Sequence, residues 1–308
     1  MTDQAALARQ VSTGILAFPA TPFTADGCLD AATMARHAGE VAQSRPAALV
    51  PAGGAGELFS LNVAEHAEVV RLTVGAAAGI PVIAGVGGGL ATAIDMGRNA
   101  EKAGADGLLV LPPYLVNAEQ EGLAHYVEAV CRGVGLPVIA YSRDNGVLRV
   151  PTLLRLADSC ANLVGVKDGT GDLDLVLETR RRLDGRLVVI NGAPTAEMLA
   201  AQSFAIGVTS YSSAVFAFAP KLAQAFYDAV AGGDAPMRDA LLEKFYFPYS
   251  AIRRRRAGNA VSIVKAGLRV TGQPVGPVRP PLLDLPDKDA EELRVLIEAG
   301  TALATGQR

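Results

Sequence analysis

The stretch LVGVKDGTGD, residues 163–172, joins a run of apolar residues to a lysine and then to a turn broken by glycines. The run is continuous rather than alternating, as expected of a strand that is covered on both faces of a sheet. A buried strand rarely ends on an ammonium group, because burying a charge is costly. Lys167 therefore either reaches water through its long side chain or serves as an amine that the protein requires there.

Seven further apolar runs have the same character, and stretches with helical periodicity lie between them. In one of these helical stretches, LNVAEHAEVVRLTVGAAAG, Asn62 is placed to cap the helix and Gly79 to end it. Eight strands that alternate with helices predict an α/β fold, a parallel (β/α)8 TIM barrel. The other apolar runs are GILAF from 14, AALVPA from 47, PVIAGV from 81, DGLLVLP from 106, PVIAY from 137, RLVVING from 186 and AIGVTSY from 205.

The alternative is an open doubly wound sheet, but eight roughly equal units without a linker favour closure. After residue 212 the pattern changes to helix following helix. We expect a barrel with the catalytic site in residues 1–231 and a C-terminal helical extension, packed on the barrel, in residues 232–308. A stiff connection with five prolines, TGQPVGPVRPPLLDLP from 271, interrupts the extension. The expected helices of this part are 212–231, 234–255, 258–271 and 287–304.

The composition of the 308 residues, their cysteines and the lack of targeting segments predict a soluble, cytoplasmic protein. The net charge is −3 and the isoelectric point is near 5.7, so nothing favours nucleic acid or an anionic membrane as a partner. The basic run at 253–256 is expected to be a solvated helix face or an oligomer contact. Cys28, Cys131 and Cys160 are widely spaced, which indicates reduced thiols. No apolar run reaches the roughly 20 residues of a membrane helix, and the start of the chain lacks an apolar signal core.

Two ionisable side chains end neighbouring strands of the predicted barrel. Strand five ends at Tyr141 and strand six at Lys167, and catalytic groups of such barrels sit at the carboxyl ends of the strands. Burial lowers the pKa of a lysine, and a neutral amine can condense with a ketone to a Schiff base. The iminium is an electron sink that needs no metal or cofactor, and a phenol beside it can shuttle protons. The competing interpretation of Lys167 is a structural salt bridge with Asp168.

Glycine-rich turns follow two of the strands. The turn GGAGE, residues 53–57, offers backbone N–H groups that can hold a carboxylate, and Glu57 is better explained as a structural hydrogen-bond partner than as a base. The turn GVGGG, residues 85–89, resembles part of a dinucleotide fingerprint. The acid that should end the following strand is missing, since Asp106 opens that strand instead, so this loop is interpreted as barrel structure.

Metal and serine-nucleophile chemistry are not expected. His37, His66 and His125 fall in helical stretches, and none has a second ligand at metal spacing. Ser210 and Ser212 lack a histidine in pattern, so a serine–histidine nucleophile is not indicated, but their hydroxyls suit a polyol or a carboxylate.

Several of these segments together resemble the dihydrodipicolinate synthase / N-acetylneuraminate lyase superfamily. The likeness covers about residues 12 to 300 and rests on ATPFTADGCLD, PAGGAGELFSL, PPYLVNAEQEGL, the strand that ends in Tyr141, and GVKDGTGDL. The resemblance implies that Lys167 forms the Schiff base, that Tyr141 is its proton-relay phenol, and that the turn at 53–57 binds the carboxylate of a 2-keto acid. It also implies a homotetramer, a dimer of dimers.

Departures from the synthase pattern favour one subfamily. The synthases have a Gly-Thr-Thr-Gly-Glu turn, a second tyrosine after strand four and an arginine five residues after the phenol. Here Gly54 and Ala55 occupy the threonine positions, Leu115 the second tyrosine and Gly146 the arginine. The segments PAGGAGELFSL, YSRDN and KDGTGD instead resemble the 5-dehydro-4-deoxyglucarate dehydratases, although Ala55 departs from the Gly-Gly-Thr-Gly-Glu consensus of that subfamily.

This resemblance implies a lyase that acts on a sugar-acid substrate through a covalent Schiff base with lysine and without a cofactor. The catalytic residues would be Lys167 and Tyr141. Two alternatives remain: a 2-keto-3-deoxy sugar acid aldolase or dihydrodipicolinate-synthase-like enzyme of the same superfamily, and a non-catalytic sugar-acid-binding protein, against which the presence of both residues argues. The residues expected to bind substrate are Gly53, Gly54, Ala55, Arg143, Asn191, Ser210 and Ser212.

Overall fold

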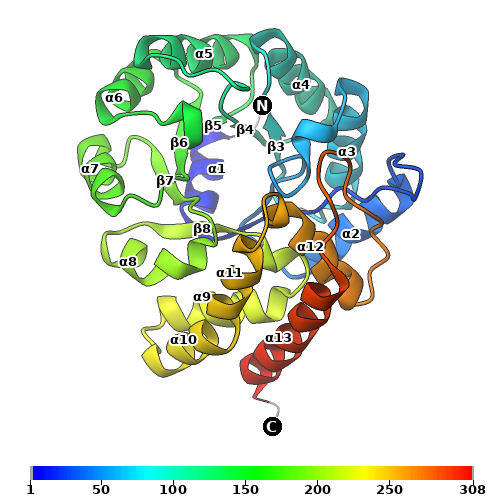
Figure 1. Ribbon diagram of the computed structural model, residues 1–308. Coiled ribbons are helices and arrows are strands. Elements are labelled where there is room, and N and C mark those ends of the chain that lie inside the picture. Colours follow the sequence, from blue (N-terminus) through cyan, green and yellow to red (C-terminus); the bar gives the residue numbers. More distant parts are fainter. Residues whose placement is uncertain (1–2, 307–308) are drawn as a thin grey trace.

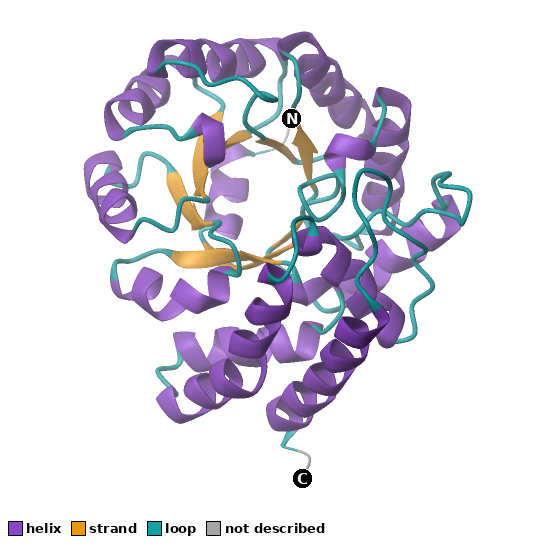
Figure 2. Cartoon of the chain, viewed as in Figure 1, coloured by secondary structure: helices purple, strands orange, loops and turns teal. Residues whose placement is uncertain are grey.

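Eight parallel strands form a ring with helices around it in the computed structural model, which describes residues 3–306 (Figures 1 and 2). Each strand pairs with its neighbour in the sheet, and an isolated bridge between Leu49 and Val82 joins the two ends of the sheet. The predicted (β/α)8 barrel is confirmed, and the open doubly wound sheet is wrong. The strands are β1 (Thr13–Ala17), β2 (Ala48–Leu49), β3 (Ile83–Val86), β4 (Gly107–Val110), β5 (Val138–Ser142), β6 (Leu163–Asp168), β7 (Val188–Asn191) and β8 (Thr209–Ser213).

One helix follows each strand and covers the outside of the ring. Helix α3 begins as the sequence predicts, because Asn62 and Glu65 form a reciprocal capping box. It ends at Ala76, and Gly79 lies just beyond with a positive φ of 85°. The barrel helices are α2 (Ala31–Gln43), α3 (Val63–Ala76), α4 (Leu90–Ala103), α5 (Gln120–Gly133), α6 (Val150–Ser159), α7 (Leu173–Leu183), α8 (Ala200–Ala205) and α9 (Pro220–Ala231).

Helix α1 (Gln4–Val11), which the sequence analysis does not predict, precedes the barrel and fills one end of it. Its apolar residues Leu7 and Val11 are buried in the same cluster as interior strand residues such as Ile83, Leu109 and Ile139. The helix contacts β1, β6 and β7. Because α1 fills this end, a functional site is expected at the opposite end of the barrel, where the strands end.

Two element boundaries around the last strand differ from the prediction. The sequence predicts strand β8 from residue 205, but helix α8 runs to Ala205 and Gly207 makes a turn with a φ of 83°. The following helix is predicted from residue 212, yet the strand continues to Ser213 and α9 begins at Pro220. Proline suits a first helical position because it lacks the N–H that would go unused there.

Within the described residues, four helices form the C-terminal extension and lie together beside α9 (Figure 1). The helix expected over 234–255 is divided by a π-helical turn (Leu242–Tyr246) just before Pro248, which cannot donate a helical hydrogen bond. The helices expected at 258–271 and 287–304 are confirmed within one residue. They are α10 (Ala235–Leu241), α11 (Phe247–Arg254), α12 (Asn259–Val270) and α13 (Asp287–Thr305).

The division into a catalytic barrel over residues 1–231 and an extension over 232–308 stays a prediction, and the first two and last two residues lie outside the described part of the chain. The extension shares an apolar core with the barrel, in which Phe245 and Ile263 pack with Ile15 and Tyr211. Among residues 3–306, no helix is both long and apolar enough to cross a membrane.

Candidate active site

Tyr141 and Lys167 are paired across strands β5 and β6, so the structure brings the two predicted catalytic side chains together. The Nζ atom of Lys167 lies 3.5 Å from the centre of the Tyr141 ring and 5.4 Å from that of Phe18. Tyr141 and Phe18 both belong to the cluster that fills the barrel interior. The amine therefore points into the barrel near the carboxyl ends of its strands.

Lys167 is 2% exposed, and no ion pair joins it to Asp168 within the part of the chain that the structure describes. The Asp168 carboxylate is instead occupied by Thr170, whose backbone N–H and hydroxyl donate to Oδ1 at 3.0 and 2.7 Å. The structural salt bridge, which the sequence leaves open as the competing interpretation, is therefore wrong.

The surroundings lower the pKa of both groups. Burial is the main cause that lowers the pKa of Lys167, and Tyr141 opposes it. Burial alone would raise the pKa of Tyr141, but the positive charges of Lys167 and Arg143 outweigh it and lower that pKa. A lysine with a lowered pKa is more often neutral, which is the form that attacks a ketone.

Arg143 lies against the Tyr141 phenol and is partly exposed. Its Nη1 donates to the Tyr141 hydroxyl at 3.2 Å, and its Nε pairs with Asp144 at 2.5 Å. The Tyr141 hydroxyl in turn donates to the carbonyl of Gly192 at 3.3 Å. The phenol thus has one donor and one acceptor that fix its orientation toward Lys167.

Two glycines make room for this pair. A Cβ atom at Gly192 would lie 2.6 Å from Lys167 Nζ, and one at Gly169 would lie 2.8 Å from Cε2 of Tyr141. Distances below 3.0 Å require the neighbour to move, so larger residues would displace the reactive side chains. Neither glycine was predicted from the sequence; in the structure Gly169 follows the last residue of β6 and Gly192 the last residue of β7.

The glycine turn at 53–57 lies at the same end of the barrel. A Cβ at Gly53 would lie 2.7 Å from the Phe18 ring, which itself faces Lys167. The carbonyls of Gly53 and Gly54 accept hydrogen bonds from Leu58 and Glu57, at 3.2 Å each. Among residues 3–306 the N–H groups of Gly54 and Ala55 have no hydrogen-bond acceptor, so they are free for a carboxylate.

Two serines of β8 face the interior, whereas Asn191 does not. Ser210 and Ser212 pair with Gly14 and Leu16, and Leu16 belongs to the interior cluster. The Ser210 hydroxyl is buried without a hydrogen-bond partner in the described residues. The Asn191 amide instead donates to Ala196 and Ser203 near helix α8. The structure therefore separates Asn191 from the other predicted substrate-binding residues.

The segment after Tyr141 also anchors a neighbouring loop. The Asn145 amide donates to the carbonyls of Pro113 and Val116, at 2.8 and 2.7 Å, in the loop that follows β4. In the sequence, Asn145 stands out only as the last residue of the segment YSRDN. Its structural role is to tie the loops after β4 and β5 together above the barrel.

The remaining motifs have structural roles. Glu57 is buried and its Oε1 pairs with Lys265 Nζ at 2.7 Å, so it is a structural partner as predicted. Asp106 accepts a hydrogen bond from the Val82 N–H at 2.9 Å. The loop GVGGG, interpreted as barrel structure, joins the end of β3 to Gly89, the N-cap residue of α4. In the basic run at 253–256, Arg255 pairs with Asp289 and Glu292 of α13.

The histidines are held by protein groups. His37 lies between the Ala20 N–H and the Gln273 side chain, and His66 Nε2 lies 2.7 Å from the Gly85 carbonyl. His125 is exposed and lies 3.0 Å from Glu121. Within residues 3–306 no group of three or more His, Cys, Asp or Glu side chains is arranged to hold a metal.

Comparisons with known proteins agree with this geometry. The chain matches the dihydrodipicolinate synthetase family over residues 11–300. It is 50% identical, over 296 residues, to a probable 5-dehydro-4-deoxyglucarate dehydratase of Rhizobium rhizogenes, and the match covers 96% of this chain and 98% of that protein. A protein of the same description from Saccharopolyspora erythraea is 48% identical over 294 residues, or 95% of each chain.

The solved structures give the same fold. Dihydrodipicolinate synthase from Oceanobacillus iheyensis superimposes with a TM-score of 0.88 at 25% identity, covering 96% of this chain and 98% of that one. The synthase from Cyanidioschyzon merolae, solved with lysine bound, gives a TM-score of 0.83 at 26% identity and covers 96% and 99%. The barrel and its C-terminal extension are thus shared along nearly the whole length of these chains.

Proposed function

The chain belongs to the dihydrodipicolinate synthetase family, and on that premise we propose that it converts 5-dehydro-4-deoxy-D-glucarate to 2,5-dioxopentanoate with loss of water and CO2. The observation that carries the proposal is the Lys167–Tyr141 pair, buried at the strand ends of a chain about half identical to proteins described as such dehydratases. The enzyme would be a decarboxylating hydro-lyase that forms a Schiff base.

Lys167 would attack the substrate ketone. Its burial lowers the pKa of the amine, which favours the neutral, nucleophilic form. Tyr141 would carry protons to and from the oxygen that leaves as water during condensation. Arg143 supports this role because it donates to the Tyr141 hydroxyl and helps to lower the pKa of the phenol.

The carboxylate next to the ketone would bind to the glycine turn. The unused N–H groups of Gly54 and Ala55 suit an anion, and Gly53 sets the turn against Phe18 beside Lys167. Ser210 and Ser212 are proposed to contact the hydroxyls, since both face the barrel interior. For the distal carboxylate we propose Arg143, which keeps a partly exposed guanidinium at the mouth.

The proposed steps balance without an added reactant. After the imine forms, loss of a proton from the neighbouring methylene gives an enamine, which expels the β-hydroxyl as water. The distal carboxylate then leaves as CO2, and its bonding electrons pass through the conjugated system to the iminium nitrogen. Return of protons to carbon and hydrolysis of the imine release the aldehyde product and free Lys167. Because the iminium accepts the electrons, we propose that no cofactor is needed.

The missing relay hydroxyls support a dehydratase over a synthase. Gly54 and Ala55 carry no hydroxyl, and Leu115 is 81% exposed where the synthase pattern has a tyrosine. An aldolase would use the same lysine, so only the fate of the carbon chain separates it from the proposed activity.

We further propose that the protein works as a homotetramer, a dimer of dimers, in the cytoplasm. Large apolar side chains are exposed between β2 and α3, at the start of α4 and in the loop after β4, and exposed apolar groups of this kind favour contacts between proteins. The cysteines are free, in keeping with a reducing compartment. Light scattering of the purified protein tests the tetramer. The exposed side chains are Phe59, Leu90, Tyr114, Leu115 and Val116.

A proton NMR time course with 5-dehydro-4-deoxyglucarate, without added metal or nucleotide, tests the activity. We expect growth of the aldehyde signal of 2,5-dioxopentanoate without pyruvate. A pyruvate methyl signal would assign the protein to the aldolases. An unchanged spectrum would contradict the proposed substrate.

A further inference from the structure

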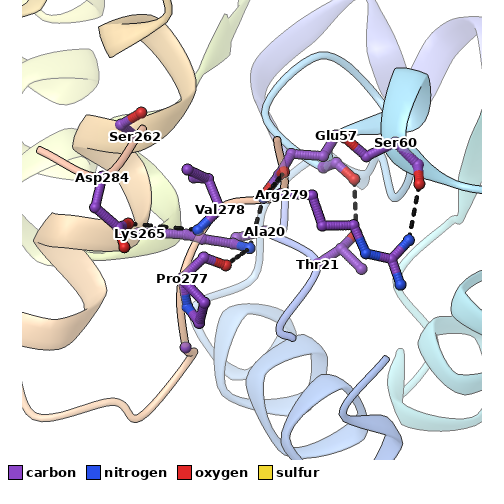
Figure 3. A network of polar contacts seen from close by, with 12 residues as sticks. Ala20, Thr21, Glu57, Ser60, Ser262, Lys265, Pro277, Val278, Arg279 and Asp284 are labelled. Carbon is purple, nitrogen blue, oxygen red and sulfur yellow. Dashed lines mark hydrogen bonds and ion pairs between the residues drawn. The ribbon is translucent and has the colours of Figure 1, made fainter. Parts of the chain in front are cut away.

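Two fully buried charges connect the glycine turn to the C-terminal extension. Glu57 ends the turn that follows β2, and Lys265 belongs to helix α12, far along the chain. Glu57 Oε1 and Lys265 Nζ lie 2.7 Å apart, and both side chains are 0% exposed (Figure 3). A buried charge must be paired to be tolerated, so each residue depends on the other.

A short segment after α12, residues 273–279, reinforces this connection, and we call it the C-terminal strap. The Phe23 N–H, in the loop after β1, donates to the Val275 carbonyl at 3.2 Å, and Lys265 Nζ donates to the Pro277 carbonyl at 2.7 Å. A Cβ at Gly276 would lie 1.7 Å from the Phe23 carbonyl oxygen. Only glycine allows the strap to approach the barrel this closely.

Arg279, the last residue of the C-terminal strap, binds the end of the glycine turn and the residues just after it. Its backbone N–H donates to Glu57 Oε2 at 3.1 Å, and its Nη1 donates to the Ser60 carbonyl at 2.8 Å (Figure 3). The same guanidinium donates to Glu65 at 2.9 Å, at the start of helix α3. The C-terminal part of the chain therefore contacts both carboxylate oxygens of Glu57: Lys265 forms an ion pair with Oε1, and the Arg279 N–H donates a hydrogen bond to Oε2.

Phe23 contacts both cations of this network. Lys265 Nζ is 4.1 Å and the Arg279 guanidinium 4.0 Å from the centre of its ring, and the ring is buried. Cations over an aromatic face are attracted to it. The loop after β1 is thus fixed to the same network as the turn after β2.

The glycine turn needs such support because its backbone is strained. Ala52 and Glu57, on either side of the glycines, have positive φ values of 51° and 55°. Residues with a Cβ adopt this region only when their surroundings impose it. The surroundings here are Thr21, whose hydroxyl donates to the Gly56 carbonyl at 2.7 Å, and the partners of Glu57.

We propose that Lys265 and the C-terminal strap are positioning elements of the active site: they hold Glu57, and through it they aim the N–H groups of Gly54 and Ala55 at the substrate carboxylate. This inference rests on the proposed function, in which that turn binds the carboxylate beside the ketone. Glu57 and Ala55 lie in the same short turn, so a shift of the Glu57 side chain turns these N–H groups. The effect is specific to carboxylate binding, because Lys167 is held by β6 and not by the strap.

The experiment compares two carbonyl compounds that differ in the carboxylate. Pyruvate carries a carboxylate next to its ketone, whereas hydroxyacetone has a ketone and no carboxylate. The rate of borohydride-trapped adduct formation at low probe concentration is measured for both with the full-length protein. The variants are Lys265→Met, the neutral pair Glu57→Gln/Lys265→Met, and the control Arg255→Met, which removes another paired cation of the extension.

In Lys265→Met we expect the rate with pyruvate to fall by at least about tenfold, the worth of one charge-assisted hydrogen bond to a carboxylate, and the rate with hydroxyacetone to stay unchanged. Arg255→Met should leave both rates unchanged. If Lys265→Met does not fold, the double variant decides, because it leaves no unpaired buried charge and the amide oxygen of its new glutamine side chain can still accept from the Arg279 N–H. In the double variant the rate with pyruvate should fall while the rate with hydroxyacetone stays unchanged. The fall with pyruvate should be smaller than in Lys265→Met.

Equal losses with both probes, or no loss with pyruvate, would overturn the positioning role and leave the proposed function standing. Absence of any adduct in the unsubstituted protein would overturn the proposed function and this inference with it.

Discussion

Lys167 and Lys265 are both buried, yet their surroundings differ in one respect that decides what each can do. Lys167 faces the Tyr141 ring at 3.5 Å and forms no ion pair within the described residues, whereas Lys265 lies 2.7 Å from the Glu57 carboxylate. Burial lowers the pKa of both amines, and the opposing partner is a phenol at Lys167 but a carboxylate at Lys265. A carboxylate stabilises the ammonium form, which cannot attack a ketone.

The comparison teaches that burial alone does not mark a reactive lysine. A lysine buried with a carboxylate is part of the structure, since either charge would be destabilising without the other. A lysine buried beside a phenol keeps a reactive, neutral form accessible, and at Lys167 the absence of a side chain on Gly192 leaves room for the amine. Substitutions of Lys167 should therefore lower turnover far more than stability. Substitutions of Lys265 should mainly lower stability and should lower activity much less.

The largest effect is expected at the lysine that faces the phenol. Lys167→Met should lower turnover by about 10⁶-fold, the scale on which loss of a covalent nucleophile acts. Its melting temperature should not fall, because the change breaks no ion pair among the described residues. Steady-state kinetics and thermal unfolding measure the two quantities. Turnover within about tenfold of that of the unsubstituted protein would contradict the assignment of Lys167 as the reactive lysine.

The phenol beside Lys167 should have the next largest effect. Tyr141→Phe keeps the ring but removes the hydroxyl, and turnover should fall by about 10²–10⁴-fold, the usual worth of a positioned acid–base group. The trapped adduct should still form, though more slowly, since the amine remains. A single-turnover rate close to that of the unsubstituted protein would remove Tyr141 from the proton relay.

At the paired lysine the main effect should be on stability. Lys265→Met leaves the Glu57 carboxylate buried without its cation, and it should lower the free energy of unfolding by about 3–5 kcal/mol. The double variant Glu57→Gln/Lys265→Met should recover most of this loss. Denaturant unfolding of both variants measures it. Equal destabilisation of the single and the double variant would contradict the pairing argument.

The smallest effect concerns the pH dependence. Arg143 adds to the lowering of the pKa of Lys167 that burial causes, so Arg143→Leu should raise that pKa. Adduct formation needs the neutral amine and increases as the pH rises through this pKa. In the variant the rising limb of the pH–rate profile should therefore move to higher pH. A shift to lower pH would show that Arg143 acts on another group.

The fold and the reactive pair could be predicted from the sequence because both depend on local patterns. Continuous apolar runs give buried strands, and residues that end neighbouring strands, such as Tyr141 and Lys167, meet by the geometry of a barrel. Asn191 also ends a strand, but side chains along a strand alternate between the two faces of the sheet. The side-chain amide of Asn191 therefore points out of the barrel, where it donates a hydrogen bond to Ser203. The position of a strand end alone did not reveal which face the side chain takes.

The support of the glycine turn could not be predicted, because it is long-range. Lys265 lies in a helix and Arg279 in a proline-rich connection, and neither pattern distinguishes these residues from surface cations. Only the three-dimensional path of the strap brings them to Glu57. Helix α1 was not predicted for a different reason. It has 8 residues and two buried apolar positions, so the periodic spacing of apolar residues in its sequence is too short to stand out.

The most direct test is to identify the lysine that carries the adduct. The protein is incubated with pyruvate and borohydride, digested, and mapped by mass spectrometry. We predict that the mass of reduced pyruvate is added to Lys167 and to no other lysine, Lys265 included. An adduct on Lys265, or an unmodified Lys167 at saturating pyruvate, would contradict the assignment of Lys167 as the nucleophile.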